Sequence, residues 1–347
     1  MTRYTLAIIL LIGLFHPLSA AEPAPTSKEV RDAVAKALPL IQKGSAGHRT
    51  QRTCFACHNQ AIPILAMTTA RSRGLPFDAD EVGKHLRFIA DFLDKNRDNY
   101  LKGRGQGGQA DTAGYALWTL EMGGWKADQT TAAVAEYLLL RNNDLDHWRA
   151  VSNRPPSEVS PFTTTYVAIR ALQHFGTDEQ KKRIEERLRG VRGWLEKTAA
   201  KDTEDRVFRL WALKRAGGEA KDVQAAAQTL IKDQRPDGGW AQRDTMKSDA
   251  YATGTVLVAL HEAAGLATSD PVYQRGVKYL LATQREDGTW HVRSRSKPFQ
   301  TYFESGFPHG KDQFISLAAS SWATTALALA LPAVERQARQ EPDAPPR

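Results

Sequence analysis

The sequence lacks several features that would place it in a common class of protein. Only two of its 347 residues are cysteines. No second cysteine pair and no His-x3-His pattern accompanies them, which argues against a zinc site. No linker rich in Pro, Gly or Ser divides the middle of the chain, so we expect one domain. After residue 21 no apolar run approaches the ~20 residues that span a bilayer, so we expect no transmembrane segment in the mature chain.

The first 21 residues have the layout of a cleaved export signal. Arg3 precedes an apolar run from Leu6 to Phe15, and the small residues 19–21 follow Pro17. That run is about half the length of a membrane helix, so a membrane anchor is the weaker alternative. We expect residues 1–21 to be a signal peptide and the mature protein to be soluble, and periplasmic or secreted.

The formal net charge is +8 and the pI is about 9.4. Acidic and basic residues are interleaved, as between Glu179 and Arg189, which is typical of a solvated helix face. We therefore expect no nucleic-acid partner. A surface for acidic partners or anionic lipid head groups stays open, and the oligomeric state is not indicated.

Two near-identical segments indicate an internal repeat. Gln234-Arg-Pro-Asp-Gly-Gly-Trp240 and Gln284-Arg-Glu-Asp-Gly-Thr-Trp290 each follow an apolar helical pattern. Asp-Gly tolerates the positive φ of a tight turn, the Trp can return to cover the preceding helix, and the Gln can bond the turn's backbone. The pattern predicts helix pairs joined by similar turns.

Apolar periodicity extends this unit to six pairs of an outer and an inner helix. The expected outer helices are 30–41, 82–93, 131–140, 179–197, 223–232 and 272–283, and the inner ones are 62–74, 111–124, 160–176, 205–217, 249–265 and 316–330. The inner helices begin with polar residues and continue with small apolar ones, as suits helices packed on both flanks. We expect an all-α single toroid over residues 28–333, a polar loop at 44–53, and a disordered tail at 334–347.

These turns and alternating helices resemble the α/α toroid of squalene and oxidosqualene cyclases and of protein prenyltransferase β subunits. The resemblance covers most of the mature chain, and its sharpest motifs lie between residues 234 and 290. It implies a six-fold barrel of helix pairs around a central apolar cavity. It does not by itself imply cyclisation.

The segment Cys54-Phe-Ala-Cys57-His58 is the one chemically specific motif. Its two thiols have the spacing that adds across haem vinyl groups, and the following His can reach the iron. We therefore predict a covalent haem c held by Cys54, Cys57 and His58, with His58 as the metal ligand. A Cys-x-x-Cys disulfide is the alternative.

The sixth ligand of such a haem is not determined by the sequence. His48, His85 and His309 stay open, as does an unliganded sixth position. Met67 lies about 13 Å along the same helix from His58, on the same side of the haem, so it cannot reach the far face.

Cyclases of this architecture that protonate an alkene carry an Asp-x-Asp-Asp acid motif at the start of an inner helix. The two starts that match in position, at Asp111 and Asp249, carry one carboxylate each. A sufficiently strong acid needs polarising neighbours, and their lack at these starts argues against terpene cyclase activity. Both residues are also explained as carboxylates that the helix dipole stabilises.

The segment from His291 to Phe314 interrupts the repeat and is rich in aromatic and titratable residues. Long irregular loops often act as lids, so we expect it to cover the mouth of the ring, although it could instead pack the closing seam. We expect it at the same end as the haem, where parallel helix N-termini gather positive potential. Candidate mouth residues are Asp111, Thr163, Asp249, Tyr302, Glu304, His309 and Asp312, with His309 or Tyr302 near the iron.

These patterns predict an exported haem c protein with an electron-transfer or haem-dependent redox role and a redox partner protein. The alternative is a toroid that binds a polyprenoid or another hydrophobic ligand, or that acts like squalene cyclase, with a structural disulfide and no haem.

Overall fold

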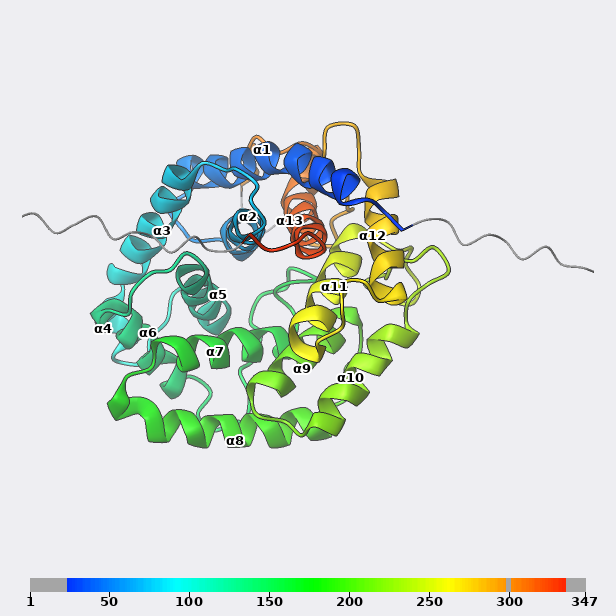
Figure 1. The fold of residues 1–347 in the computed structure, drawn as a ribbon. Helices are drawn as coiled ribbons and strands as arrows, with labels where there is room; N and C mark the ends of the chain where they lie inside the picture. Colours follow the sequence, from blue (N-terminus) through cyan, green and yellow to red (C-terminus); the bar gives the residue numbers. More distant parts are fainter. Residues whose placement is uncertain (1–23, 298–300, 335–347) are drawn as a thin grey trace, which may run out of the picture.

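Two concentric layers of helices form the molecule (Figure 1). The computed structural model describes residues 24–297 and 301–334, and within these ranges it contains helices and no β-strand. The outer layer consists of α1 (Ser27–Gln51), α3 (Ala79–Asp94) with the short α4 (Arg97–Tyr100), α6 (Gln129–Leu140), α8 (Lys181–Lys197), α10 (Ala220–Lys232) and α12 (Pro271–Thr283). The inner layer consists of α2 (Ile62–Ser72), α5 (Gln109–Met122), α7 (Pro161–Phe175), α9 (Thr203–Arg215), α11 (Ala250–Ala264) and α13 (Gln313–Leu329).

The inner helices form a closed ring. Each packs against the next in chain order, and α13 packs against α2. Outside this ring α1 contacts both α3 and α12, so the first and last outer helices also meet. The predicted all-α toroid of six helix pairs is confirmed.

The repeated turns explain why the pairs stack regularly. The Trp240 indole donates to the carbonyl of Leu230 at 2.7 Å, ten residues earlier, and Trp290 donates to Leu280 at 2.8 Å. Trp148 does the same from the degenerate third turn, with Leu138 as acceptor at 2.9 Å. Each indole thus fixes the turn onto the helix that precedes it.

The turn glutamines link neighbouring units. Gln234 donates to the carbonyls of Gly238 in its own turn and Val272 on the next outer helix. Gln284 donates in the same way to Gly288 at 2.9 Å and to Ala33 on α1 at 2.9 Å. Gly288 has φ of 89°, a conformation that favours glycine. The second turn therefore closes the ring between its last and first outer helices.

The loop predicted at 44–53 is wrong for most of its length, because α1 continues to Gln51. Gly44 and Gly47 bring this part of α1 against the segment that precedes α13. A Cβ at Gly47 would lie 1.8 Å from the carbonyl oxygen of Ser305. The two glycines thus serve close packing of a helix, which sequence periodicity cannot distinguish from a loop.

Two predictions fall largely outside the described residues. The predicted signal peptide, 1–21, lies there entirely, and so does the predicted tail except for Val334. Among the described residues, no helix is both long and apolar enough to cross a membrane.

Candidate functional site

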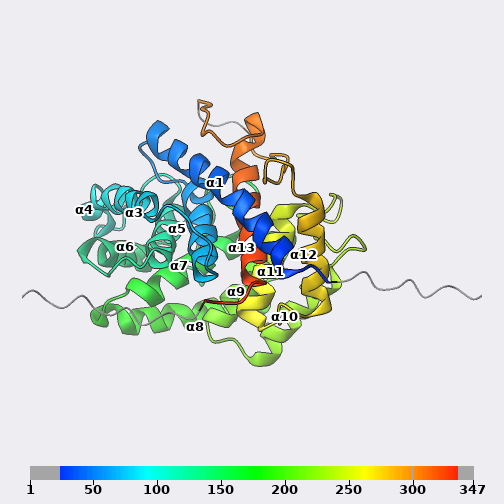
Figure 2. The ribbon, with the colours of Figure 1, turned by 45° about the horizontal axis from the view of Figure 1, so that its top comes forward.

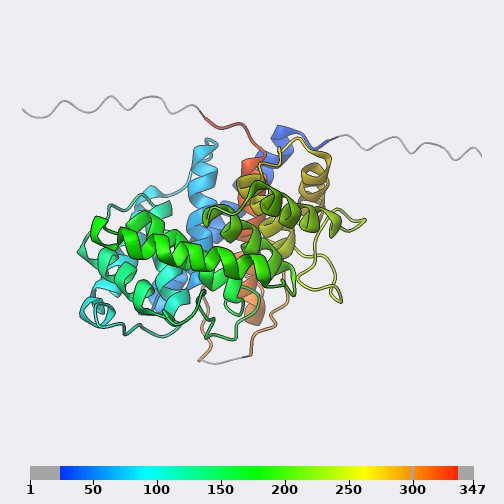
Figure 3. The same ribbon diagram turned by 90° about the horizontal axis from the view of Figure 1, so that it is seen from below.

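The long loop lies at one end of the ring, with the polar starts of the inner helices. Figures 2 and 3 show this segment projecting from the ring next to the first turn of α13. The π-helical turn η1 (Cys57–Ala61) and the 3-10 turn η3 (Gly310–Asp312) lie at the same end. His58 and Phe314 meet there, with ring centroids 5.9 Å apart. The structure therefore brings the Cys54–His58 motif and the loop together, as expected.

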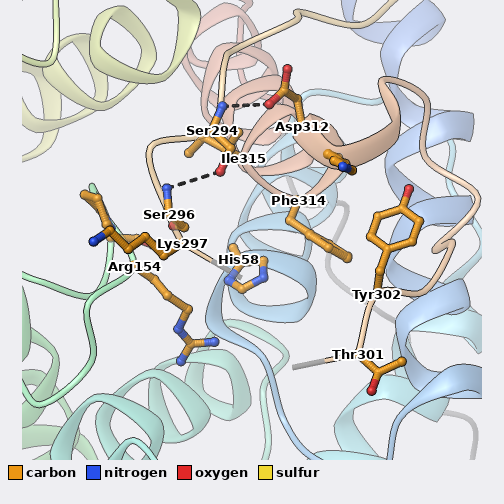
Figure 4. A pocket seen from close by; sticks show the side chains of 13 residues that line it. His58, Arg154, Ser294, Ser296, Lys297, Thr301, Tyr302, Asp312, Phe314 and Ile315 are labelled. Atoms are coloured by element: carbon orange, nitrogen blue, oxygen red, sulfur yellow. Dashed lines mark hydrogen bonds between the residues drawn. The ribbon is translucent and has the colours of Figure 1, made fainter. Parts of the chain in front are cut away.

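A pocket of about 380 Å³ opens between them (Figure 4). Its apolar wall includes Phe314, Tyr302 and Ile315, and its polar wall includes His58 and Arg154. The remaining lining residues come from two loops and the turn η3 and are Pro155, Ser157, Ser294, Ser296, Lys297, Thr301, Lys311 and Asp312. The volume falls in the range of about 300–1,000 Å³ that is usual for small-molecule sites.

Glu158 organises the polar wall of the pocket. It is buried, accepts a hydrogen bond from Nδ1 of His58 at 3.4 Å, and forms an ion pair with Arg154. Burial acts to raise the pKa of Glu158, but the hydrogen bond from His58 and the charge of Arg154 outweigh it, and the pKa lies below its ordinary value. Glu158 is therefore an ionised carboxylate held between two cationic or hydrogen-bonding groups.

A second buried glutamate has the opposite charge state. Glu204, in the first turn of α9, is 4% exposed, and its Oε1 accepts hydrogen bonds from Thr163 at 3.1 Å and Tyr251 at 3.4 Å. Burial, together with the nearby carboxylates Asp202 and Asp205, raises the pKa of Glu204 to about 8. Its Oε2 has no partner among the described residues. Glu204 is thus a neutral acid at pH 7 with one oxygen free.

Glu204 belongs to an acidic sequence, Asp202-Thr203-Glu204-Asp205, at an inner-helix start. Asp202 caps α9 by accepting the N–H of Asp205 at 3.1 Å. Asp205 accepts from Ser160 at 2.6 Å and from the N–H of Lys201 at 2.9 Å. Both flanking carboxylates are therefore fixed by donors, while Glu204 alone points an unbonded oxygen into the interior.

Asp111 and Asp249 lie at the two starts that the sequence singled out. Asp111 is buried and accepts from Thr164 at 2.5 Å, and burial raises its pKa to about 7. Asp249 caps α11 through the N–H of Ala252 at 2.9 Å, and burial raises its pKa to about 6. Both lie where the helix dipole acts, since Asp249 caps α11 and Asp111 is in the first turn of α5, but burial outweighs this effect and raises both pKa values.

The other predicted mouth residues separate into two groups. Tyr302 and Asp312 line the pocket, and the exposed Glu304 accepts the hydroxyl of Tyr302 beside it. His309 lies outside the pocket lining, where its Nε2 bonds to Thr289 at 2.8 Å. Thr163 lies in the interior on Glu204.

The predicted haem c does not fit this geometry. Cys57 is 2% exposed, belongs to the apolar core and bonds through its thiol to Glu158. Neither cysteine lines the pocket, although His58 does. Among the described residues no three His, Cys, Asp or Glu side chains are grouped so that they could hold a metal ion. Both cysteines are free thiols in the structure, so the alternative disulfide is not formed either.

The candidate sixth ligands of the haem either bond to other residues or lie away from His58. His48 uses both ring nitrogens, on the carbonyl of Cys54 and on Asn59, each at 3.0 Å. His85 is buried on α3 beside Glu81. His309 contacts His291 and Phe307 rather than His58.

Two buried residues of this end of the ring, Glu204 and Glu158, were not predicted from the sequence. The acidic run at 202–205 could have been identified from the sequence. Like the other inner helices, α9 begins with polar residues, and this run also has the neighbouring carboxylates that Asp111 and Asp249 lack. Glu158 had no such signal. It lies in the irregular connection between α6 and α7, and only the fold brings it to His58, 100 residues away in sequence.

The chain is similar to known proteins of the squalene-hopene cyclase and terpene synthase type. Residues 191–341 match the family of the squalene-hopene cyclase C-terminal domain. A squalene–hopene cyclase from Bradyrhizobium diazoefficiens is 33% identical over 128 residues, which are 31% of this chain and 18% of the relative. A drimenyl diphosphate synthase from Streptantibioticus cattleyicolor is 27% identical over 207 residues, which are 55% of this chain and 37% of the relative. The chain thus spans less than two fifths of either curated relative.

Solved structures show the same fold. The type II terpene cyclase MstE from Scytonema, in complex with geranylgeranyl dihydroxybenzoate, superposes with a TM-score of 0.56 at 15% identity, over 88% of this chain and 98% of that one. The unliganded enzyme gives 0.52 at 16% identity. The prediction of a haem c electron-transfer protein was therefore wrong, and the alternative fits better: the protein is a terpene cyclase-like α/α toroid.

Proposed function

We propose that this protein binds a terpenoid alkene at the mouth of the ring and protonates it, as an acid-initiated cyclase. The observation that carries the proposal is Glu204. It is a buried, neutral carboxylic acid with a free oxygen, and Asp202 and Asp205 flank it. These two carboxylates raise the pKa of Glu204 and so keep its proton bound at neutral pH, and their charge attracts the cation that forms when the proton is transferred.

The surroundings of Glu204 suit a reaction through a carbocation. When Oε2–H gives its proton to an alkene carbon, the resulting carboxylate keeps the hydrogen bonds that Thr163 and Tyr251 already donate to Oε1. The new cation forms beside three carboxylates in a site of low dielectric, where their attraction is strong. The aromatic side chains below, which include Tyr115 and Trp118, present π faces that attract cations.

Two residues, Tyr115 and Arg295, connect the pocket with this acid. Tyr115 donates its hydroxyl to the carbonyl of Ser157 at 3.3 Å, and Ser157 lines the pocket. Tyr115 is also an electrostatic neighbour of Glu204 and Tyr251. On the opposite side Arg295, between the lining residues Ser294 and Ser296, interacts with the charges of Asp202 and Glu204. A ligand in the pocket would therefore lie above the acidic starts of the inner helices.

The names of the relatives agree with a terpenoid ligand. One relative makes drimenyl diphosphate, another is a squalene–hopene cyclase, and MstE was solved with geranylgeranyl dihydroxybenzoate. Lys297 and Lys311 at the pocket suit a ligand with an anionic head group. We also propose that the protein works after export, which the predicted signal peptide supports.

Turnover in deuterated water tests the proposal. The purified protein is incubated with farnesyl diphosphate, geranylgeranyl diphosphate and squalene, and products are analysed by mass spectrometry. We expect a cyclised product that carries one deuterium, and a loss of at least about 100-fold in rate for Glu204→Gln. Glu136→Gln, which removes the partner of Arg183 on an outer helix, is the matched control and should keep full activity. A wild-type protein that binds these alkenes without incorporating deuterium would refute the acid role.

A further inference from the structure

The axis of the ring is filled by aromatic side chains from four inner helices. We call Tyr115, Trp118, Tyr166, Trp211 and Trp322 the axial plug. The ring centroids of Trp118, Trp211 and Trp322 lie 5.7–6.4 Å apart, and all three indoles are at most 3% exposed. Tyr166 stacks on Trp211 at 5.2 Å, and Tyr115 stacks on Trp118 at 5.8 Å. The plug therefore blocks the lumen.

Tryptophans of the plug differ from the other buried tryptophans in the hydrogen bonding of their indole N–H groups. Trp148, Trp240 and Trp290 each donate to a backbone carbonyl and so hold a turn in place. The buried indole N–H groups of Trp118 and Trp211 have no acceptor among the described residues. Buried indoles normally find a partner, and leaving one unpaired is costly. These two rings are thus placed for their volume and their faces, not for hydrogen bonding.

An ionic network closes the far side of the plug. Arg170 lies over the ring of Trp118, with its guanidinium carbon 5.0 Å from the ring centroid. It donates to both oxygens of Glu121, at 2.6 and 3.0 Å, and to the hydroxyl of Tyr166 at 2.7 Å. The ring is therefore sealed below the plug, and a ligand must enter and leave at the His58 end.

The top of the plug lies behind the wall of the pocket. The Tyr115 hydroxyl bonds to the carbonyl of Ser157, a pocket-lining residue, and Trp118 lies directly beneath Tyr115. A chain that enters the pocket is separated from the axis by Ser157 and by the plug behind it, so it cannot continue along the axis. The available space is then the pocket's own volume of about 380 Å³.

We infer that the axial plug limits the ligand to about fifteen carbons and so makes this ring a site for sesquiterpenoid-sized chains. Engineered apolar cavities of about 150 Å³ hold benzene, with six carbons, and by that measure 380 Å³ holds about 15 carbons. Squalene would then be too long. The inference rests on the proposed function for the class of ligand, but it concerns binding, which does not require turnover.

Binding of a chain-length series tests the inference. Dissociation constants are measured for ten-carbon geraniol, fifteen-carbon farnesol and twenty-carbon geranylgeraniol. We expect the wild type to bind farnesol at least tenfold more tightly than geraniol, and to bind geranylgeraniol no more tightly than farnesol. In Tyr115→Ala/Trp118→Ala the removed rings open the axis, and geranylgeraniol should bind at least tenfold more tightly than farnesol. Trp194→Ala, which removes an indole stacked on His147 at 4.6 Å on outer helix α8, is the matched control and should keep the wild-type order.

The outcomes separate this inference from the proposed function. Wild-type protein that binds geranylgeraniol at least tenfold more tightly than farnesol would overturn the inference, and so would an unchanged order in the folded double variant. If that variant does not fold, Trp118→Leu opens a smaller cavity and should also make geranylgeraniol bind more tightly than farnesol. If the wild type shows the expected order of dissociation constants but no turnover, only the proposed function is overturned. If it binds none of the three alcohols, both the inference and the proposed function are overturned.

Discussion

Replacing Glu204 by Gln should stabilise the protein at high pH although it removes the proposed acid. The pKa of Glu204 is raised from 4.5 to about 8, mainly because of burial. At about 1.4 kcal/mol per pKa unit, ionisation of this group in the folded protein is opposed by about 5 kcal/mol at most. Gln keeps an oxygen for Thr163 and Tyr251 and cannot ionise.

The sign of the pH dependence follows from proton uptake. Below pH 4.5 Glu204 is protonated in both the folded and the unfolded chain, so Glu and Gln should differ little. Between pH 4.5 and about 8 only the folded chain keeps the proton, so the stability of the wild type falls by up to about 1.4 kcal/mol per pH unit. Above pH 8 no further loss comes from this group. Glu204→Gln should thus gain stability over the wild type, rising from about zero at pH 4 to as much as about 5 kcal/mol at pH 9.

Urea unfolding at several pH values measures this difference, and Glu158→Gln is the matched control. Glu158 is also a buried glutamate, but its pKa is lowered, so its ionised form stabilises the folded protein. That contribution is present above the unfolded pKa and is lost as pH falls through the folded pKa, so Glu158→Gln should destabilise the protein at pH 7. Parallel stability–pH curves for the wild type and Glu204→Gln would refute the reasoning about Glu204.

Three further changes test the turns and the mouth. Trp240→Phe leaves the carbonyl of Leu230 without its donor and should lower the free energy of unfolding by about 2 kcal/mol in urea titrations. Gly47→Ala places a methyl group against the carbonyl of Ser305 and should lower Tm and speed proteolytic cleavage of the loop before α13. Asp312→Ala removes the acceptor of His291 and of the Ser294 N–H, so farnesol should bind at least about threefold more weakly at nearly unchanged Tm.

The fold could be predicted from the sequence because its signal is local and repeated. The interactions that form each Gln-x-x-Asp-Gly-x-Trp turn lie close by in the sequence, as the positive φ of Gly238 and the bond from Trp240 to a carbonyl ten residues earlier show. The closure of the ring was predictable only as a consequence of the repeat. The extension of α1 through Gly44 and Gly47 was not predictable, because these glycines pack against Phe307 and Ser305, which lie more than 250 residues away in sequence.

The site was predicted less well, for a physical reason that the cysteine motif illustrates. The spacing of Cys54, Cys57 and His58 describes a local geometry that several chemistries share. Which chemistry applies depends on what the side chains face, and Cys57 faces the core and Glu158. The acidic run at 202–205 was local and readable. What the sequence could not show is the state of Glu204, since that depends on burial by the other inner helices.

Glu158 and Glu204 are two buried carboxyl groups that their surroundings hold in opposite charge states. Both are nearly inaccessible to solvent, so burial alone would make both neutral. Glu158 receives Arg154 and the His58 N–H and stays charged, whereas Glu204 lies beside Asp202 and Asp205 and keeps its proton. A charged wall at the mouth can hold and orient a polar group, and a neutral acid further in can deliver a proton to the apolar chain behind it. The two environments are separate because the two residues come from different elements, a loop between α6 and α7 and the first turn of α9.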